Sequence, residues 1–440
     1  MSSRALVEDC LDAAHDPVGE GARVFIDTFD TGARTAAEAA DYLPATPDLP
    51  LRGLPISVKD LFDIEGQVTR AGSVLLKGAA PAQQDSPVVA RLKNAGAVLI
   101  GRTNMTEFAF SALGLNPHYG TPRSPYSRHE DHIPGGSSSG AAVSVSDGMA
   151  VAAIGSDTAG SVRIPAALCG LTGFKPTARR VPTQGALPLS TTLDSIGPIA
   201  PSVACCALLD EVLSGETHAL REVSIRDLRL GVLQGFVLED LEPEIAGRFD
   251  AALRTLRDAG ATITEVSCDA IADIPRLNSK GSFSAFESYA WHKSLIEQNA
   301  DGYDPRVLFR IMRGREIAAE EYADLHRERS RIIAAAEKTF DGIDAWLLPT
   351  LPRIAPRIAD VQCSDEAYFE ANSAMLRNTM IVNFMDGCAI TLPCHLPGEA
   401  PVGLMLAQSA CGDSRLLAIA HVVEQALAKA GCAIQGRQAL

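Results

Sequence analysis

The sequence has little positive charge and no long apolar run. Of its 440 residues, 39 are Lys or Arg and 54 are Asp or Glu, so the formal net charge is -15. Nucleic-acid-binding proteins carry a basic patch or stripe, and we therefore predict no nucleic-acid partner. No segment approaches the roughly 20 apolar residues of a membrane span, and the N-terminus lacks the pattern of a signal peptide. We expect a cytoplasmic protein with no membrane partner.

The ten cysteines follow no regular spacing. Most stand singly in apolar segments such as PAALCGLTG, and no CxxC pair occurs. Disulfide frameworks and zinc sites depend on such spacing, so we expect reduced cysteines that pack in the core. His129 and His132 could in principle hold a metal, but their polar loop favours a solvated turn. We predict neither a metal nor a cofactor.

Short apolar runs alternate with helical segments along most of the chain. We expect a helical N-terminal segment over residues 1–50, a core of alternating strands and helices over 51–215, a more helical and charged segment over 216–342, and a return to the core over 343–440. Alternating strands and helices are typical of α/β layers with buried strands. Because no repeat or low-complexity linker divides the chain, we predict a single α/β domain over residues 1–440.

The stretch GGSSSG, residues 135–140, has three consecutive serines between glycines. Read as G-x-S-x-G, it would make Ser138 the nucleophile of an α/β-hydrolase elbow. Such an elbow needs an apolar strand directly before it, whereas SRHEDHIP is a polar loop that ends in proline. We therefore expect Ser138 and Ser139 to begin a helix.

The residues after this stretch should bring two distant serines together. A helix over 138–147 travels roughly 15 Å outward, and the strand that follows returns roughly 20 Å. This places Ser137 near Ser161, in the turn SDTAGS after the strand. The small residues of the turn can direct several backbone N–H groups into one concavity, as an oxyanion requires. An ordinary strand-to-helix turn is the alternative.

A serine nucleophile needs a base, and Lys59 is a better candidate than the histidines. The nine histidines show no catalytic spacing, whereas Lys59 directly follows a β-branched run in LPISVKDLFD. Burial disfavours the ammonium form and lowers the pKa of a lysine, which makes it a base near neutral pH. The alternative is a lysine that reaches from an edge strand to water.

Together these segments resemble the amidase signature family. PLRGLPISVKDLFDIEG is similar to the family's lysine segment, GRTNMTEFAF to the strand and helix after it, and residues 134–177 to its serine- and glycine-rich core. TLDSIGPIA and the run from Asn383 to PVGLMLAQ also match. The resemblance covers nearly the whole chain, is weakest over about 215–340, and implies a central twisted mixed β-sheet covered by helices on both sides.

The resemblance implies a Ser–cisSer–Lys triad. Ser161 is then the nucleophile, Ser137 is the bridging serine after an expected cis Gly136–Ser137 peptide, and Lys59 is the base. Neutral Lys59 takes a proton from Ser137 while Ser137 takes one from Ser161, and water later hydrolyses the acyl-enzyme by the same relay. The family's oxyanion hole maps to the N–H groups of Thr158, Ala159, Gly160 and Ser161.

Three further residues have supporting roles in this resemblance. Ser156 is expected to support the lysine through its hydroxyl, and Asp157 and Arg163 are expected to pair and hold the turn. Many family members have two glycines before the nucleophile, whereas this chain has Ala159 and Gly160. The methyl group restricts φ but leaves the N–H in place, so we expect activity to be retained.

The resemblance leaves the substrate open among amides, malonamide-like acids, biuret-type ureas, carbamates and fatty amides. Acid-binding members use an arginine near the nucleophile, and no such arginine is assigned here because Arg163 already has a structural role. Aromatic residues in the variable segment favour an uncharged or aryl amide or carbamate. The expected pocket residues, for each of which core packing is the alternative, are Phe108, Leu113, Tyr119, Phe283, Phe286, Tyr289, Trp291 and Phe384.

We predict an enzyme that hydrolyses a carboxamide C–N bond, giving a carboxylate and an amine or ammonia. Carbamates, as in a urethanase, ureas and esters are further candidate substrates, and the expected partner is a small-molecule amide. Two alternatives stay open: the A subunit of a tRNA-dependent amidotransferase, and an inactive homologue that acts as a binding protein. A homodimer is one oligomeric state that we consider.

Overall fold

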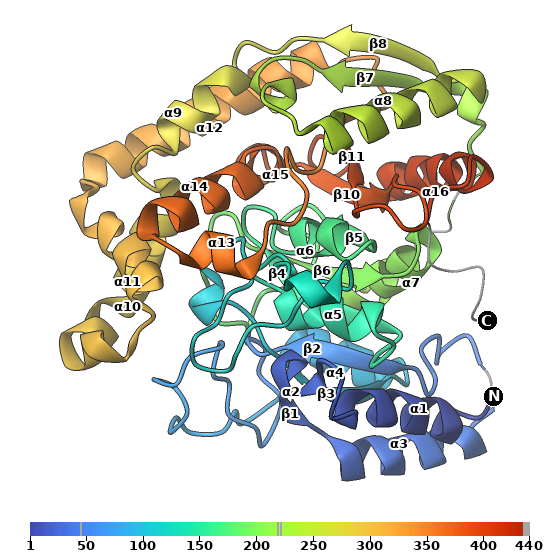
Figure 1. Cartoon of the computed structure of the whole chain (residues 1–440), viewed down its shortest axis with the longest axis vertical. Coiled ribbons are helices and arrows are strands. Elements are labelled where there is room, and N and C mark those ends of the chain that lie inside the picture. Colours follow the sequence, from blue (N-terminus) through green and yellow to red (C-terminus); the bar gives the residue numbers. More distant parts are fainter. Residues whose placement is uncertain (45, 218–219, 221, 434–440) are drawn as a thin grey trace.

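The strands of this computed structural model form one 11-stranded mixed sheet (Figure 1). The structure describes residues 1–44, 46–217, 220 and 222–433. The strands are β1 (Phe25–Thr28), β2 (Pro55–Lys59), β3 (Val98–Thr103), β4 (Ala152–Asp157), β5 (Thr172–Lys175), β6 (Ser195–Ala200), β7 (Arg229–Leu233), β8 (Thr262–Val266), β9 (Ala345–Pro349), β10 (Cys388–Pro393) and β11 (Gly403–Gln408). Their order in the sheet is β1-β3-β2-β4-β6-β5-β10-β11-β9-β7-β8.

Strand direction changes along the sheet. β2 is parallel to both β3 and β4, whereas β4 is antiparallel to β6 and β10 is antiparallel to β5 and β11. At the far end β7 is parallel to β8 and β9. Every residue of β2 and β4 is buried, as expected for apolar strands covered on both faces. The predicted mixed sheet is confirmed.

Helices cover both faces of the sheet (Figure 1). They are α1 (Ser3–His15), α2 (Gly21–Val24), α3 (Asp30–Tyr42), α4 (Pro87–Asn94), α5 (Ser139–Ser146), α6 (Arg163–Leu168), α7 (Val203–Ser214), α8 (Pro243–Asp258), α9 (Ile274–Leu277), α10 (Ser282–Asn299), α11 (Pro305–Met312), α12 (Ala319–Thr339), α13 (Ile358–Gln362), α14 (Asp365–Leu376), α15 (Thr379–Phe384) and α16 (Asp413–Lys429). Successive residues of β4 point to opposite faces. Ala153 accordingly belongs to the buried cluster that contains residues of α1, α3 and α5, whereas Ile154 belongs to the cluster that contains residues of α4, α7 and α16.

Two segments differ from the sequence-based expectation. Within residues 1–50, β1 interrupts the helices and pairs with β3, because Phe25 is buried against the sheet there. Within 216–342, β7 and β8 extend the sheet at its edge, where β8 keeps mostly exposed or partly exposed side chains. Because β7 pairs with β9, this segment and the C-terminal segment share one sheet within a single domain.

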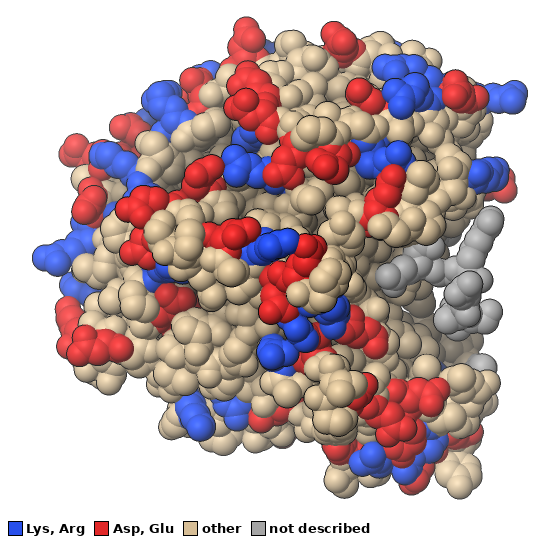
Figure 2. Space-filling view, in the orientation of Figure 1, with Lys and Arg blue, Asp and Glu red and all other residues tan. Residues whose placement is uncertain are grey.

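Charges of both signs are mixed on the face shown in Figure 2, where Lys and Arg side chains lie among Asp and Glu. Over the part of the chain that the structure describes, no helix has both the length and the apolar character needed to cross a membrane.

Candidate active site

The ends of two neighbouring parallel strands bring the predicted lysine next to serines from other segments. β2 ends at Lys59 and β4 ends at Asp157, and Val58 pairs with Ile154. Lys59 Nζ donates to Ser137 Oγ at 2.7 Å and to the Oγ of Ser156, in β4, at 2.8 Å. Lys59 is fully buried, so its ammonium form has lost its hydration. Lys59 is therefore not a lysine that reaches from an edge strand to water, and its burial disfavours the charged form.

Ser137 is held on both sides by backbone contacts. The Gly136–Ser137 peptide bond is cis, as the resemblance implies. Gly136 N–H donates to Ala112 O at 2.7 Å, and a Cβ at Gly136 would lie 2.6 Å from Gly114 N. On the other side, Ser137 O accepts from Thr106 N–H at 3.1 Å. These contacts hold the Ser137 hydroxyl within hydrogen-bond distance of Lys59 Nζ, just before the start of α5.

The turn after β4 carries Ser161. Ser138 N–H donates to Ser161 O at 3.3 Å, so the segment that begins α5 lies against this turn, as the helix-and-strand geometry predicts. Gly160 has φ +135°, and a Cβ there would clash with Thr379 Oγ1. The Thr379 hydroxyl itself donates to Ala159 O at 2.6 Å. The backbone of the turn is therefore closely fixed from α15.

A buried ion pair holds the turn from below. Arg163 donates through Nη2 to Asp157 Oδ1 at 2.9 Å and through Nε to Oδ2 at 3.0 Å, and both side chains are fully buried. Burial alone would raise the pKa of Asp157, but the Arg163 guanidinium holds it well below its usual range. Asn383, in the segment that matched the family near the C-terminus, donates to the same carboxylate at 2.9 Å.

The predicted oxyanion donors divide into two groups. Gly160 N–H donates to Asp157 Oδ1 at 2.8 Å, so this hydrogen points into the protein and cannot also face an oxyanion. This contact counts against the expected role of Gly160 and follows from the tight turn that brings the Asp157 carboxylate beneath it. The N–H groups of Thr158, Ala159 and Ser161 make no hydrogen bond within the described residues.

The charge state of Lys59 depends on burial and on two carboxylates. Burial lowers its pKa to about 7, and the negative charges of Asp194 and Asp157 oppose that shift. Asp194 comes from TLDSIGPIA, and burial raises its own pKa to about 6. It accepts from Thr158 Oγ1 at 2.5 Å, so it contacts the turn as well. Sequence reasoning matched this motif but gave Asp194 no role.

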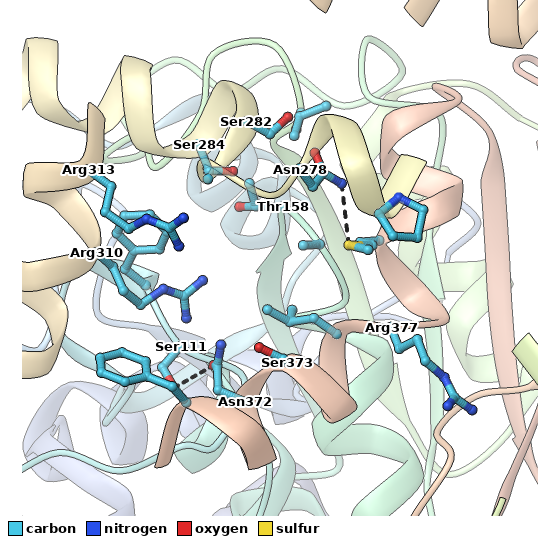
Figure 3. A pocket seen from close by; sticks show the side chains of 18 of the residues that line it. Ser111, Thr158, Asn278, Ser282, Ser284, Arg310, Arg313, Asn372, Ser373 and Arg377 are labelled. Carbon is cyan, nitrogen blue, oxygen red and sulfur yellow. Dashed lines mark hydrogen bonds between the residues drawn. The ribbon is translucent and has the colours of Figure 1, made fainter. Parts of the chain in front are cut away.

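Ser161 lines a cavity of about 880 Å³. Figure 3 shows this cavity from close by. Thr158 and Ala159 also line it, and α9, α10, α11, α14 and α15 supply further parts of its wall. The helical segment 216–342 therefore supplies part of the pocket wall. In the described part of the chain, no group of three or more His, Cys, Asp or Glu side chains is arranged to hold a metal ion.

Of the predicted pocket residues, Phe384 lines the cavity and the others do not. The Phe108 ring packs edge-on against His292 with 4.4 Å between ring centroids, and the Phe283 ring packs against His326 with 4.8 Å. Both phenylalanines are buried, so they are core residues. Tyr119 donates from its hydroxyl to Ser73 O at 3.4 Å, and Trp291 is 41% exposed. The cavity also lacks contact with Leu113, Phe286 and Tyr289.

The aromatic residues that do line the cavity are Phe110, Phe236, Phe309, Phe369 and Phe384. Phe110 lies two residues beyond Phe108 in the matched segment GRTNMTEFAF. Phe108 and Ala109 have φ of 49° and 61°, so the chain kinks here and the usual alternation of side chains does not apply. No sequence pattern signals this kink.

Comparisons with known proteins agree with this geometry. A model of the amidase family matches residues 5–417. The 2-amino-5-chloromuconic acid deaminase of Comamonas testosteroni is 38% identical, over 99% of this chain and 95% of that protein. The A subunit of the glutamyl-tRNA(Gln) amidotransferase of Roseiflexus sp. (strain RS-1) is 31% identical, over 95% and 92%. A crystal structure of an amidase has a TM-score of 0.87 at 31% identity, over 97% and 96%. The resemblance is confirmed, and the chain belongs to the amidase family.

Proposed function

We propose that this enzyme hydrolyses the C–N bond of a small-molecule carboxamide through Ser161, Ser137 and Lys59. The observation that carries the proposal is the buried Lys59 amine, which contacts Ser137 Oγ at 2.7 Å beside the cavity that Ser161 lines. A fully buried lysine with two serine hydroxyls as partners serves no evident packing purpose. Its lowered pKa leaves a large neutral fraction at neutral pH, as a base requires.

In the acylation step, neutral Lys59 accepts the Ser137 hydroxyl proton while Ser137 accepts that of Ser161. The Ser161 Oγ attacks the amide carbonyl and forms a tetrahedral oxyanion. As the C–N bond breaks, the relay runs in reverse. Ser137 gives its proton to the leaving nitrogen and takes one back from Lys59, and the nitrogen departs as an amine or ammonia. Water then attacks the Ser161 ester and gives a proton to the relay. As the bond between the carbonyl carbon and Ser161 Oγ breaks, the relay returns a proton to Ser161 Oγ and the carboxylic acid leaves.

Backbone donors in the turn would stabilise the oxyanion. We assign this role to the N–H groups of Thr158, Ala159 and Ser161, which are free of other hydrogen bonds within the described residues. Donors fixed in advance need no reorganisation during the reaction, and each is commonly worth about 10²–10³ in rate. The contacts of Thr379 and Asp194 hold the turn in the required shape.

The amidotransferase relatives favour a second candidate, the A subunit of a tRNA-dependent amidotransferase, because the alignment covers 95% of this chain. That function needs a partner protein. Steady hydrolysis of amides by the isolated chain, without ATP or a second protein, would support the independent hydrolase, whereas activity that appears only with a partner would support the amidotransferase role. The presence of Lys59, Ser137 and Ser161 argues against an inactive binding protein.

The proposal is tested by serine variants assayed on aryl amides, aliphatic amides, ureas, carbamates and esters. We expect Ser161→Ala to lower kcat/KM roughly 10⁴-fold or more on every substrate, because the attacking oxygen is gone. Ser138→Ala is the matched control and should stay within about threefold of wild type, since its Oγ makes one long contact, 3.4 Å to Ser156 O. A loss confined to Ser138→Ala would contradict the assignment.

A further inference from the structure

One glutamate of the helical segment 216–342 contacts a loop beside the proposed active site. Glu287 lies in α10, a helix that lines part of the cavity (Figure 3). Its carboxylate accepts hydrogen bonds from the loop over residues 189–194 and from α12. Loop 189–194 directly precedes β6 and contributes Leu189 and Leu193 to the cavity wall. Glu287 therefore joins the helical segment to a part of the chain next to the nucleophile.

Four donors surround the Glu287 carboxylate. Its Oε2 accepts from Ser190 Oγ at 2.6 Å and from Thr192 N–H at 3.1 Å. Its Oε1 accepts from the hydroxyl of Tyr322, in α12, at 2.6 Å and from Thr192 Oγ1. A carboxylate has roughly four acceptor positions, so these donors fill them. Glu287 is thus occupied as a fixed acceptor for loop 189–194 and α12, rather than free to bind a substrate.

Ser190 joins Glu287 to a second carboxylate. Its hydroxyl donates to Glu287, whereas its backbone N–H donates to Asp194 Oδ2 at 3.0 Å. Leu189 N–H donates to the same Asp194 oxygen at 2.9 Å, and Asp194 N–H donates to Ser190 O at 2.9 Å. Ser190 is fully buried, so a lost partner could not be replaced by water without moving the loop. Loop 189–194 is therefore fixed between two carboxylates, one from α10 and one of its own.

Asp194 extends this arrangement to the turn after β4. Its Oδ1 accepts from Thr158 Oγ1 at 2.5 Å, and the backbone N–H of Thr158 is one of the proposed oxyanion donors. The two carboxylates also interact electrostatically. Burial raises the pKa of Asp194 to about 6, and the charge of Glu287 acts in the same direction. A continuous series of contacts thus runs from Glu287 through Ser190 and Asp194 to Thr158.

Thr158 depends on this series of contacts more than its neighbour in the turn does. Thr379 of α15 donates to Ala159 O at 2.6 Å, so Ala159 has a support of its own. For Thr158, the contact with Asp194 is the one hydrogen bond within the described residues. The direction of the Thr158 N–H therefore depends on where loop 189–194 lies.

We propose that Glu287 is a positioning residue that acts through Ser190 and Asp194 to direct the Thr158 N–H toward the oxyanion. The inference rests on the proposed function, and it gives a residue of the helical segment 216–342 a part in the reaction itself. Glu287 is not among the described residues that line the cavity. Its effect should therefore fall on kcat, through the turn, rather than on substrate binding.

The first test is Glu287→Met, which keeps the length of the side chain and removes both acceptor oxygens. On the amide that the wild type hydrolyses best, kcat should fall about tenfold while KM changes less than about threefold. This is less than the roughly 10²–10³ of a lost oxyanion donor, because the Thr158 N–H would be displaced rather than removed. Glu297→Met changes an exposed glutamate of the same helix and should behave as the wild type.

Glu287→Gln should recover most of kcat, because an amide can satisfy the same four groups. Its oxygen can accept from Ser190 Oγ and Thr192 N–H, and its NH₂ group can donate to the hydroxyls of Thr192 and Tyr322, since hydroxyls also accept. A Glu287→Gln enzyme as slow as Glu287→Met would contradict a role that rests on this geometry.

A double-mutant cycle separates this series of contacts from general damage to the fold. Thr158→Val removes the hydroxyl that contacts Asp194 and keeps the backbone N–H. In that background Glu287→Met should lower kcat less than about twofold further, because the series is already interrupted. Ser190→Ala removes one contact with Glu287 and should give the same non-additivity with Thr158→Val. An equal fall in both backgrounds, or a rise in KM without a fall in kcat, would overturn the positioning role.

The rate at which a fluorophosphonate probe labels Ser161 provides a second readout that needs no amide substrate. Attack on phosphorus also develops negative charge on an oxygen, so labelling should slow about tenfold in Glu287→Met and stay near the wild-type rate in Glu297→Met. Unchanged labelling in Glu287→Met would refute the inference. If Glu287→Met does not fold, Ser190→Ala with Thr158→Val decides the question by the same cycle. Hydrolysis and labelling that survive Ser161→Ala would instead overturn the proposed function.

Discussion

The strand-end core and the helical wall of the cavity are built in different ways. In the core, Lys59, Ser137 and Ser156 are fully or almost fully buried and joined by contacts of 2.7–2.8 Å at the ends of neighbouring strands. In the wall, side chains such as the exposed Phe309 and the partly exposed Arg310 come from α11, within the 216–342 segment. From this difference we expect the core to fix the reaction and the wall to select the substrate.

The largest effect that separates the two regions should come from the core. Lys59→Met should lower kcat/KM about 10²–10⁴-fold on every amide that the enzyme hydrolyses, because the proposed general base is lost. In the wild type, kcat/KM should fall about tenfold per pH unit below pH about 7, as Lys59 gains a proton. In Lys59→Met the remaining activity should lose this acid limb, and a pH–rate profile from pH 5 to 9 measures it.

A second buried lysine provides the control. Lys175 is also fully buried, with its pKa lowered by burial to about 8, but its Nζ donates to the carbonyls of Pro176 and Gly387. Lys175→Met should therefore keep the acid limb near pH 7, whatever it costs in stability. If the limb disappears in Lys175→Met and persists in Lys59→Met, the assignment of the base is wrong.

A smaller effect is expected at Asp194, which lies outside the triad but whose charge raises the pKa of Lys59. Asp194→Asn removes a negative charge that favours protonated Lys59, so the pKa of Lys59 should fall and the acid limb should move to lower pH. The change also weakens the contact with Thr158 Oγ1. Because the Thr158 N–H that we propose as an oxyanion donor would be displaced rather than removed, we expect kcat to fall about tenfold, less than the roughly 10²–10³ of a lost donor.

The Asp194→Asn variant also tests whether Asp194 belongs to the core or to the wall. The fall in kcat should be the same for aryl and aliphatic amides, since Asp194 acts on the core. A change in substrate preference without a shift of the pH profile would instead assign Asp194 to the wall.

The core could be read from the sequence because local rules determine it. The lengths of α5 and β4 return the chain to its starting edge, and the β-branched run before Lys59 predicts its burial at a strand end. The direction of the Gly160 N–H could not be read, because it depends on how the Asp157 carboxylate folds back under the turn. Similarly, the strand β1 could not be predicted locally, because it depends on pairing with β3, which lies far along the chain.

The wall could not be read from the sequence for a related reason. Ser111 and Asn372 form a hydrogen bond although 261 residues separate them in the chain. Arg310 lies over the Phe110 ring, and the hydrogen bond from Asp304 N–H to Glu107 joins the start of α11 to the loop that carries Phe110. Such long-range contacts leave no periodic pattern. Aromatic residues in α10 looked like pocket residues, yet Phe283 packs into the core and Trp291 points elsewhere. Composition alone does not distinguish the two faces of such a helix.

The most direct test of the central claim is to locate the covalent adduct that a fluorophosphonate probe forms with the full-length protein. Peptide fragmentation should place a single adduct on Ser161, and the labelling rate should rise with pH through about 7 as Lys59 loses its proton. Labelling should persist in Ser138→Ala and be absent in Ser161→Ala. An adduct on Ser138, or intact labelling in Ser161→Ala, would contradict the account.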